Sequence, residues 1–312
     1  MPEGDVLHRL ATTFDEEFGG RRCRVSSPQG RFASSAARID GWTSTGAHAV
    51  GKHLFVGFAP PGSDEGGPRG ASSPDPQLWL HVHLGLYGSW RFAGDADFAA
   101  PAFIGAPRVP VEVLAGPDGA WEPPEPVGQV RVRLATEHGV ADLSGPTRCE
   151  LLTDPERRAA EAALGPDPLA PGAAADREAR ERFVSGVRRS RRAVGELVMD
   201  QTVVAGVGNI YRAESLFLTG ISPLRRGDRV SEARLRELWD VICRLMAHGL
   251  EVGRIETVRA ADAPEPPLEG DPEASRWYVY HRTGRPCLHC GTPVREGPMQ
   301  GRRLFWCPTC QH

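Results

Sequence analysis

The sequence predicts a mixed α+β protein in which a β-rich first half precedes a helical second half and a small C-terminal ribbon. Three observations carry this prediction: alternating apolar and polar residues before about residue 150, a helical spacing of apolar residues after it, and two Cys-x2-Cys pairs near the end. Alternation with period two is typical of half-buried strands, whereas repetition every three to four residues is typical of amphipathic helices. The 312 residues suffice for more than one hydrophobic core.

The first half contains short strand patterns separated by loops rich in proline, glycine and serine. The clearest strand patterns lie at residues 52–58, 78–90 and 129–134. Turn-forming residues dominate 59–77 and 93–126, which predicts exposed loops and, for the first of them, a mobile one. We therefore expect an antiparallel β domain with long loops.

The second half shows helical patterns. Segments that suit helices lie at residues 156–164, 177–189, 194–201 and 210–218. Ser231 is the expected N-cap of a long amphipathic helix that runs through Leu250, because a serine hydroxyl there can accept a backbone N–H. An acidic, proline-rich connector over residues 260–275 leads to the cysteine pairs.

Charge is distributed unevenly along the chain. The formal net charge is −3, yet residues 1–150 carry 13 basic and 18 acidic side chains while residues 151–312 carry 24 and 22. Residues 183–195 hold four arginines and no acid, and the last 37 residues hold six arginines and a single acid. Such runs indicate either a solvated face or a phosphate-binding surface, whose affinity would fall as salt rises. Lys52 is the only lysine among 37 basic residues.

The sequence also argues against some classes of protein. It has no run of about 18 apolar residues, so it predicts no membrane span. Its first residues lack a basic and then apolar leader, so we expect a protein that is not secreted.

Four of the seven cysteines form two pairs, Cys287-x2-Cys290 and Cys307-x2-Cys310, with sixteen residues between them. Two pairs at this spacing can bring four thiolates to one tetrahedral zinc ion. Disulfides are the alternative, but a protein in a reducing compartment keeps its thiols. We therefore predict one structural zinc ion per chain.

A glycine-rich turn, Gly206-Val207-Gly208-Asn209, lies between two predicted helices. Such a turn can present unpaired backbone N–H groups to a phosphate, and Asn209 can add a side-chain donor while it caps the following helix. A plain connection between two helices is the alternative interpretation.

The N-terminus offers a nucleophile. Removal of Met1 before a small proline would leave Pro2 as a secondary amine. An α-amino group has a pKa of about 7.7–8.0, against about 10.4 for lysine, so more of it is neutral at pH 7. Such an amine can attack C1′ of a deoxyribose and form an iminium, with Glu3 beside it as proton donor or base.

Two further turns carry candidate residues. Leu86 and Tyr87 lie in a Gly-Leu-Tyr-Gly turn. Apolar residues on a turn either pack into a core or stay exposed as wedges that fill the gap left by an extruded base. Arg302 and Arg303 lie between the cysteine pairs, at the expected tip of a hairpin.

Together these motifs resemble the formamidopyrimidine-DNA glycosylase/endonuclease VIII family of base-excision repair enzymes. The matching stretches follow the family's order over almost the whole chain: residues 1–5 (MPEGD), 51–54 (GKHL), 83–88 (HLGLYG), 164–169 (LGPDPL), 199–211 (MDQTVVAGVGNIY) and the cysteine ribbon through Gln311. The resemblance implies an N-terminal antiparallel β-sandwich over residues 1–150, a helical domain with a helix–two-turn–helix motif over 151–275, and a zinc finger over 276–312. It also implies a monomer that binds double-stranded DNA containing damaged bases or abasic sites, in a cytoplasmic, nucleoid-associated location as in bacteria.

The resemblance assigns roles residue by residue. Pro2 matches the Schiff-base nucleophile and Glu3 the general acid that assists opening of the sugar. Lys52 matches the lysine of β-elimination and phosphate contact, and Arg302 matches the zinc-hairpin arginine that assists δ-elimination. The remaining matches are DNA binding for Asn209, Gly206, Gly208, Leu86 and Tyr87, and zinc binding for Cys287, Cys290, Cys307 and Cys310.

Departures from the family pattern bear on the substrate. The Gly4-Asp5 pair and the Leu86-Tyr87 pair look like the endonuclease VIII branch, whose usual targets are oxidised pyrimidines. The Arg-Phe-Gly loop of the purine-specific branch is not evident near residues 143–149, and the Gly-Gly-Thr-Thr loop of that branch is replaced by residues 252–257. Val6 stands where an acid is frequent in the family.

We therefore expect a bifunctional DNA glycosylase/AP lyase that flips an oxidised base, favours pyrimidines, displaces the base through Pro2 and nicks the strand by β,δ-elimination. Two alternatives remain open. One is a glycosylase for 8-oxoguanine and formamidopyrimidines. The other is a non-catalytic damaged-DNA-binding protein, which the acidic first half and Val6 favour.

Overall fold

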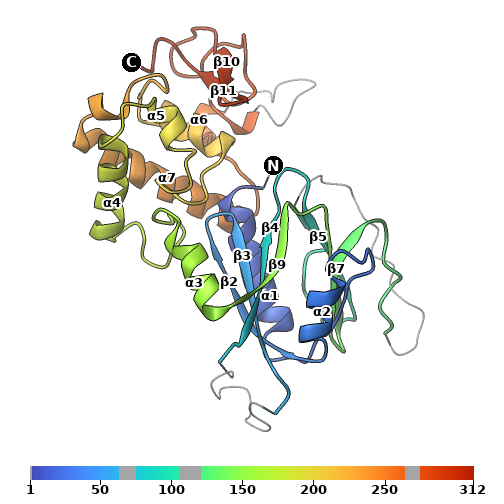
Figure 1. Cartoon of the computed structure of the whole chain (residues 1–312). Coiled ribbons are helices and arrows are strands. Elements are labelled where there is room, and N and C mark those ends of the chain that lie inside the picture. The colour runs from blue at the N-terminus through green and yellow to red at the C-terminus, as the bar shows by residue number, and fades with distance from the viewer. Residues whose placement is uncertain (1, 63–74, 106–120, 264–274) are drawn as a thin grey trace. The chain divides into compact units, whose positions relative to one another are not determined.

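The computed structural model describes residues 2–62, 75–105, 121–263 and 275–312, and it confirms a mixed α+β fold (Figure 1). Large parts of the expected loops at 59–77 and 93–126, and most of the expected connector at 260–275, lie outside the described residues. The described chain divides into two compact units: the first holds Pro2 and residues 6–162, and the second holds residues 3–5 and 163–312. The expected boundaries at residues 150 and 275 stay predictions.

The first unit is an antiparallel β-sandwich, as expected. Its strands are β1 (Arg24–Ser26), β2 (Thr43–Val50), β3 (His53–Ala59), β4 (Leu78–His83), β5 (Ser89–Gly94), β6 (Phe103–Gly105), β7 (Val130–Ala135), β8 (Gly139–Ser144) and β9 (Arg148–Thr153). One sheet has the order β1-β7-β8-β5-β6 and the other the order β2-β3-β4-β9. Every neighbouring pair is antiparallel. Inward side chains of both sheets, such as Val56, Leu80 and Trp90, form one hydrophobic core.

Three helices accompany the sandwich: α1 (Gly4–Phe18), α2 (Ala33–Ile39) and α3 (Asp154–Ala162). Of these three helices, only α3 was predicted from the sequence. The apolar side chains of α1, at Leu7, Leu10, Phe14 and Phe18, recur every three to four residues and join the sandwich core. This spacing is the amphipathic pattern of a helix, and it was present in the sequence.

The second unit is helical and ends in a hairpin. Its elements are α4 (Arg177–Arg188), α5 (Val194–Leu197), α6 (Asn209–Leu218), α7 (Glu232–Val252), β10 (Arg295–Met299) and β11 (Arg302–Trp306). Ser231 caps α7 by accepting the N–H of Arg234, as predicted, and Gly253 ends the helix in the left-handed region. None of the helices in the described ranges is long and apolar enough to cross a membrane.

The helix expected over residues 194–201 is shorter than predicted, because α5 ends at Leu197. The side chain of Asp200 accepts both the backbone N–H and the hydroxyl of Thr202, at 3.1 and 2.7 Å. Such local side-chain bonds compete with helical hydrogen bonding and favour turns. The chain therefore turns before it enters α6.

A buried carboxylate attaches the segment before the cysteine hairpin to α6. Glu214 is fully buried and accepts backbone N–H groups from Tyr278, Val279 and Tyr280 at 2.7, 2.9 and 2.9 Å. It also accepts the hydroxyl of Thr257. Burial raises the pKa of Glu214, while these four donors act in the opposite direction. The packing of the second unit therefore includes a polar anchor at its centre.

Replacement of Glu214 by glutamine should destabilise the second unit, because the amide nitrogen then faces backbone N–H groups that have lost their acceptor. Unpaired buried donors cost about 1–3 kcal/mol each, so we expect the free energy of unfolding to fall by roughly 3 kcal/mol. Urea unfolding followed by tryptophan fluorescence measures this. Glu237 lies exposed on α7, and the control Glu237→Gln should change stability by no more than about 0.5 kcal/mol. Equal changes in the two variants would contradict the anchor.

Candidate active site

Glu3 caps helix α6 from the other end of the sequence. The N-cap residue of α6 is Gly208, which has no side chain to accept a hydrogen bond. The carboxylate of Glu3 takes this role: Oε2 accepts the N–H of Gly208 and Oε1 accepts the N–H of Ile210, both at 2.8 Å. Glu3 is fully buried. The positive end of the helix dipole makes this a favourable place for a carboxylate.

This arrangement corrects two expectations about the glycine turn. The N–H groups of Gly206 and Gly208 are not unpaired, because Gly206 donates to Oε1 of Gln201 at 2.9 Å and Gly208 donates to Glu3. Asn209 is the first residue of α6 rather than its cap. A Cβ on Gly208 would lie 2.3 Å from Cδ of Glu3, so the carboxylate requires glycine at this position.

The backbone beside Glu3 is fixed as well. Gly4 donates its N–H to the carbonyl of Gly206 at 2.9 Å. Pro2 is buried and is joined to Glu3 by a single peptide bond, so its nitrogen lies within one residue of the anchored carboxylate. The paired roles predicted for Pro2 and Glu3 are compatible with this placement.

Asn209 is hydrogen-bonded to the C-terminal hairpin. Its Nδ2 donates to the carbonyl of Arg303 at 2.9 Å, and its Oδ1 accepts from Nη2 of Arg212. Arg212 is buried and also donates to the carbonyl of Arg303, at 2.8 Å. Burial lowers the pKa of Arg212 to about 10, and the charge of Glu3 acts in the opposite direction. The start of α6 and the start of β11 are therefore one hydrogen-bonded group.

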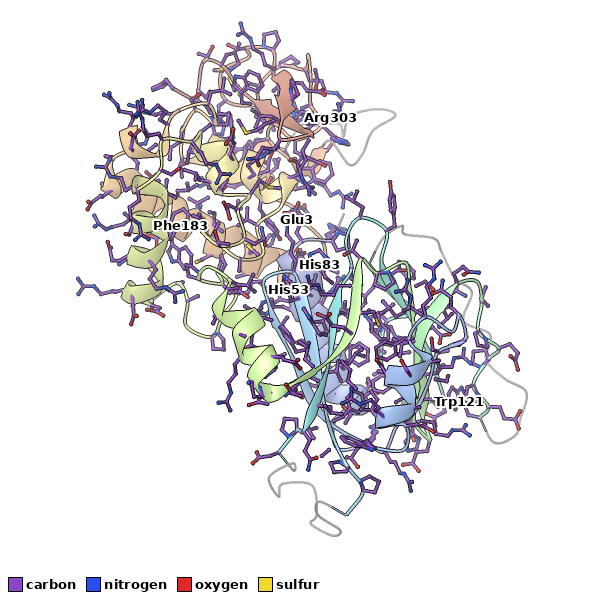
Figure 2. All side chains as sticks on the ribbon, viewed as in Figure 1. Glu3, His53, His83, Trp121, Phe183 and Arg303 are labelled. Carbon is purple, nitrogen blue, oxygen red and sulfur yellow. The ribbon has the colours of Figure 1, made fainter. Side chains whose placement is uncertain are left out.

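Arg302 and Arg303 begin β11 directly after a turn at Gln300 and Gly301, both with positive φ, which confirms the hairpin tip. Nη2 of Arg303 donates to Oε2 of Glu296 at 2.7 Å, and this contact lowers the pKa of Glu296 to about 2. Arg302 is exposed, and its charge is one cause of the lowered pKa of Arg212. Figure 2 labels Glu3, which caps α6, and Arg303, whose carbonyl accepts from Asn209 and Arg212.

The four C-terminal cysteines converge. Their sulfur atoms all lie within 4.8 Å of one another, and no disulfide joins them. The Sγ atoms of Cys287 and Cys310 are 3.9 Å apart, and those of Cys290 and Cys307 are 3.5 Å apart. Metal–sulfur bonds of about 2.3 Å in a tetrahedron require sulfurs about 3.8 Å apart. The four thiols therefore fit a single metal ion.

Lys52 belongs to the first unit, in the two-residue turn that joins β2 to β3. His53 follows it and pairs across the sheet with His83 at the end of β4. Burial lowers the pKa of both imidazoles, and the positive charge of Lys52 contributes to both shifts. Figure 2 labels both histidines at this end of the sheet.

Leu86 and Tyr87 lie in the turn between β4 and β5. Their side chains are 48% and 75% exposed. Large apolar side chains at this exposure are not part of a core. The structure therefore supports the interpretation as exposed wedges over the interpretation as core residues.

The second unit thus brings together Glu3, Asn209 and Arg302, whereas the first unit holds Pro2, Lys52 and the Leu86-Tyr87 turn. Arg212 and Glu214 were not predicted as functional residues from the sequence. Both are charged residues in a helix whose other residues are mostly apolar. A charge among apolar neighbours on a helix signals a specific buried partner, and this signal was available in the sequence.

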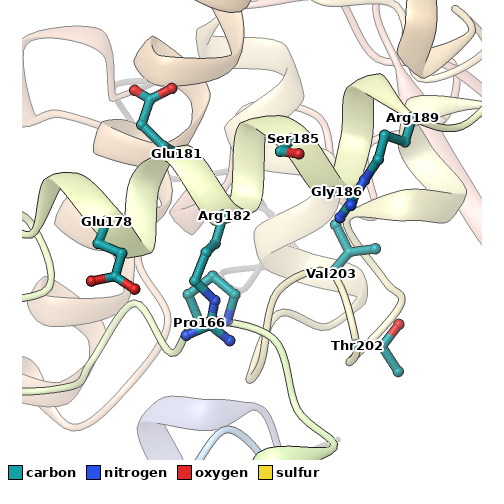
Figure 3. Close-up of a pocket in the computed structure, with 9 residues that line it drawn as sticks. All are labelled: Pro166, Glu178, Glu181, Arg182, Ser185, Gly186, Arg189, Thr202 and Val203. Atoms are coloured by element: carbon teal, nitrogen blue, oxygen red, sulfur yellow. The ribbon is translucent and has the colours of Figure 1, made fainter.

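The pocket in Figure 3 lies elsewhere in the second unit. It encloses about 480 Å³ along α4, between Glu178, Arg182 and Arg189 on one side and Thr202 and Val203 on the other. None of the predicted site residues lines it. We therefore place the candidate site at the N-terminus of α6 and not in this pocket.

The chain is similar to known proteins over its whole length. Residues 164–260, which contain α6, match the formamidopyrimidine-DNA glycosylase H2TH domain. Endonuclease 8 1 of Mycobacterium tuberculosis H37Rv is 41% identical over 311 residues, covering 100% of both chains. Probable endonuclease 8 2 of Streptomyces coelicolor is 30% identical over 317 residues, covering 100% of this chain and 94% of the other. The Lactococcus lactis Fpg, in complex with DNA containing N7-benzyl-Fapy-dG, has a TM-score of 0.70 and 20% identity over 99% of each chain, which shows a shared fold.

The contact between Gly208 and Glu3 can be tested by a double-mutant cycle. Gly208→Ala alone should destabilise the second unit, because its methyl group displaces the carboxylate that caps α6. In the Glu3→Ala background the same change should cost much less, giving a coupling energy of about 1 kcal/mol or more in urea unfolding. The control is Gly186→Ala in α4, where a Cβ would lie 3.5 Å from Val203 and should fit. Strictly additive effects of the two substitutions would refute the contact.

Proposed function

Since the chain belongs to the endonuclease 8 and formamidopyrimidine-DNA glycosylase family, whose members are DNA glycosylases and AP lyases of base excision repair, we propose that it excises oxidised pyrimidines through Pro2. The observation that carries the proposal is the anchored carboxylate of Glu3, one peptide bond from Pro2 and held by the N–H groups of Gly208 and Ile210. A buried carboxylate beside an amine can take the proton that the amine loses and then act as the acid, and the deprotonated amine is the nucleophile that base excision requires.

The first chemical step forms a covalent intermediate at Pro2. With Met1 removed, the secondary amine attacks C1′ of the damaged nucleotide, and the glycosidic bond breaks as the nitrogen–carbon bond forms. The departing base takes the electron pair of the broken bond and is protonated by water. Glu3 takes up the proton that the Pro2 nitrogen loses and delivers it to the ring oxygen, which opens the sugar and leaves an iminium between Pro2 and C1′.

The next steps cleave the strand. The amine of Lys52 removes a proton from C2′, and the electron pair expels the 3′ phosphate in β-elimination. Arg302, exposed at the tip of the β10–β11 hairpin, binds the phosphate whose loss completes δ-elimination. A guanidinium suits this role because its planar donors match phosphate oxygens.

DNA binding is assigned to groups on both units. Nδ2 of Asn209 donates to the carbonyl of Arg303, and the Asn209 side chain is also hydrogen-bonded to Tyr280, so a phosphate oxygen would replace one of these partners. The N–H groups of Gly206 and Gly208 already donate within the protein, so these glycines would contribute to DNA binding by having no side chain. Leu86 and Tyr87 would fill the duplex where the damaged base leaves it.

The four cysteines would hold zinc. The fit rests on four thiols within 4.8 Å of one another in two Cys-x2-Cys turns, a donor set typical of structural zinc. The ion would fix the hairpin that carries Arg302. The groups that react with DNA in this proposal are those of the protein chain, namely Pro2, Glu3 and Lys52.

The choice of pyrimidines rests on the whole-chain relatives that are named endonuclease 8. A glycosylase for 8-oxoguanine and formamidopyrimidines is the alternative. The family assignment removes the support for a non-catalytic DNA-binding protein.

Borohydride should trap a covalent complex between the chain and DNA that contains an oxidised pyrimidine, because hydride reduces the iminium to a stable amine. Peptide mapping should place the adduct on Pro2. Blocking removal of Met1 should abolish trapping while binding to the same DNA persists. A panel that includes 8-oxoguanine, formamidopyrimidine and abasic duplexes ranks the lesions, and a stronger signal with purine lesions would refute the pyrimidine assignment. Trapping by a chain that keeps Met1 would refute the role of Pro2.

Removal of zinc should loosen the hairpin and with it Arg302. We expect metal analysis to find one zinc per chain and Cys307→Ser to weaken its retention. The variant should lose at least about tenfold in strand cleavage, since mutation of groups that only support metal ligands already costs about 10–100-fold in metal affinity or activity. The control is Cys243→Ser, a buried cysteine of α7 outside the cluster, which should retain zinc. A fully active chain without bound metal would contradict this assignment.

A further inference from the structure

Aromatic and imidazole rings form a continuous row on one face of the β2-β3-β4-β9 sheet. The centroid of Phe55 lies 5.3 Å from that of His48 and 4.6 Å from that of His81. His53 continues the row at 5.1 Å from His81 and at 5.1 Å from His83. The row ends at the turn that contains Lys52. Neither the fold nor the proposed chemistry explains why four of its five members are histidines.

Two of these histidines are linked in a hydrogen-bonded chain. Nδ1 of His53 lies 2.8 Å from Nε2 of His81, and Nδ1 of His81 lies 3.0 Å from Oε1 of Glu150. A carboxylate only accepts, so His81 carries its proton on Nδ1 and presents a lone pair at Nε2. His53 must then donate from Nδ1, which leaves the lone pair of its ring on Nε2.

This assignment holds when both rings are neutral. Burial is the largest cause that lowers the pKa of His53, to about 3, and that of His81. The charged groups that act on these rings are Arg148 and Glu150 on β9, Glu161 on α3 and Lys52 in the turn, with His83 on β4 facing His53. Each ring therefore has one N–H and one lone pair at neutral pH. A ring in this state can accept a proton on one nitrogen while it donates the proton of the other, so that it remains neutral.

The two ends of the chain differ in their surroundings. Lys52 is adjacent to His53 in sequence, and its charge is felt by both His53 and His83. His81, in the middle, is fully buried. Glu150 is 43% exposed at its side chain and can exchange protons with water. The chain thus runs from the lysine turn through a buried ring to solvent.

We propose that His53, His81 and Glu150 form a proton relay that discharges Lys52 between the two eliminations, as positioning residues that act through that lysine. The inference rests on the proposed function of Lys52 in β-elimination. After Lys52 has taken the proton from C2′, it is an ammonium. δ-Elimination removes a second proton, from C4′, and Lys52 is assigned this step as well, so the lysine must first lose the proton that it holds.

The relay moves one proton and oxidises nothing. The Nζ proton of Lys52 passes to Nε2 of His53, directly or through one water, as the Nδ1 proton of His53 moves to Nε2 of His81. The Nδ1 proton of His81 then moves to Glu150, which releases it to solvent. Both rings end neutral with their tautomers exchanged, and they return to the first arrangement by exchange with water.

The test compares His81→Phe and Glu150→Gln with the wild-type full-length chain on DNA with a preformed abasic site. His81→Phe keeps a ring in the row but removes both nitrogens. Glu150→Gln keeps an oxygen that accepts from His81 but cannot take up its proton. His48→Phe is the matched control, because it makes the same ring replacement on the same face outside the relay.

Both relay variants should form the borohydride-trapped complex at the wild-type rate. Their single-turnover yield of δ-elimination product at pH 7 should fall about tenfold, which is less than the roughly 10²–10⁴-fold of a direct general acid or base because the relay acts through Lys52. The deficit should shrink towards pH 9, where hydroxide removes the proton from Lys52, and it should be relieved by added imidazole. His48→Phe should match the wild type throughout.

Other results would overturn the relay. A loss in Glu150→Gln that is independent of pH and insensitive to imidazole would show that the row is structural only. Wild-type product ratios in Glu150→Gln would also refute the proposal, and this variant decides the matter if His81→Phe fails to fold. Absence of trapping in the wild type would instead refute the proposed function of Pro2, so the two failures are distinguishable.

Discussion

The second unit depends on one hydrogen-bonded contact, the carboxylate of Glu3 at the N-terminus of α6. A helix that begins after two glycines has no local acceptor for its first N–H groups, and an uncapped buried helix end is costly. Glu3 supplies the acceptor. The contact fixes the position of the residue next to the proposed nucleophile, and it also explains why Gly208 cannot carry a side chain. The same carboxylate therefore stabilises the start of α6 and takes part in the proposed chemistry.

Elements defined by local signals could be predicted from the sequence. Ser231 and Gly253 mark the ends of α7, and the alternating residues of β3, β4 and β7 mark strands. The cysteine spacing predicted a hairpin with Arg302 at its tip, because two Cys-x2-Cys turns must meet if their thiolates bind the same metal ion. These features depend on residues that are close in sequence, so the local structure that they form depends little on the rest of the fold.

Features that depend on distant partners could not be predicted in the same way. A glycine turn before a helix looks identical whether its N–H groups bind a phosphate or a carboxylate of the same chain, and here Glu3 comes from more than 200 residues away. Arg212 likewise finds its acceptor at Arg303. The helix α1 is a different case, because its apolar residues Leu7, Leu10, Phe14 and Phe18 already have helical spacing in the sequence.

The turn that contains Lys52 gives the use of arginine elsewhere a physical meaning. A guanidinium keeps its proton at any pH at which enzymes work, whereas an amine can release it. With 36 arginines and one lysine, the positive charge that attracts DNA is constant across that range. A change of pH can therefore change the protonation of Lys52, the proposed base, while the arginine charges that bind the DNA phosphates stay the same.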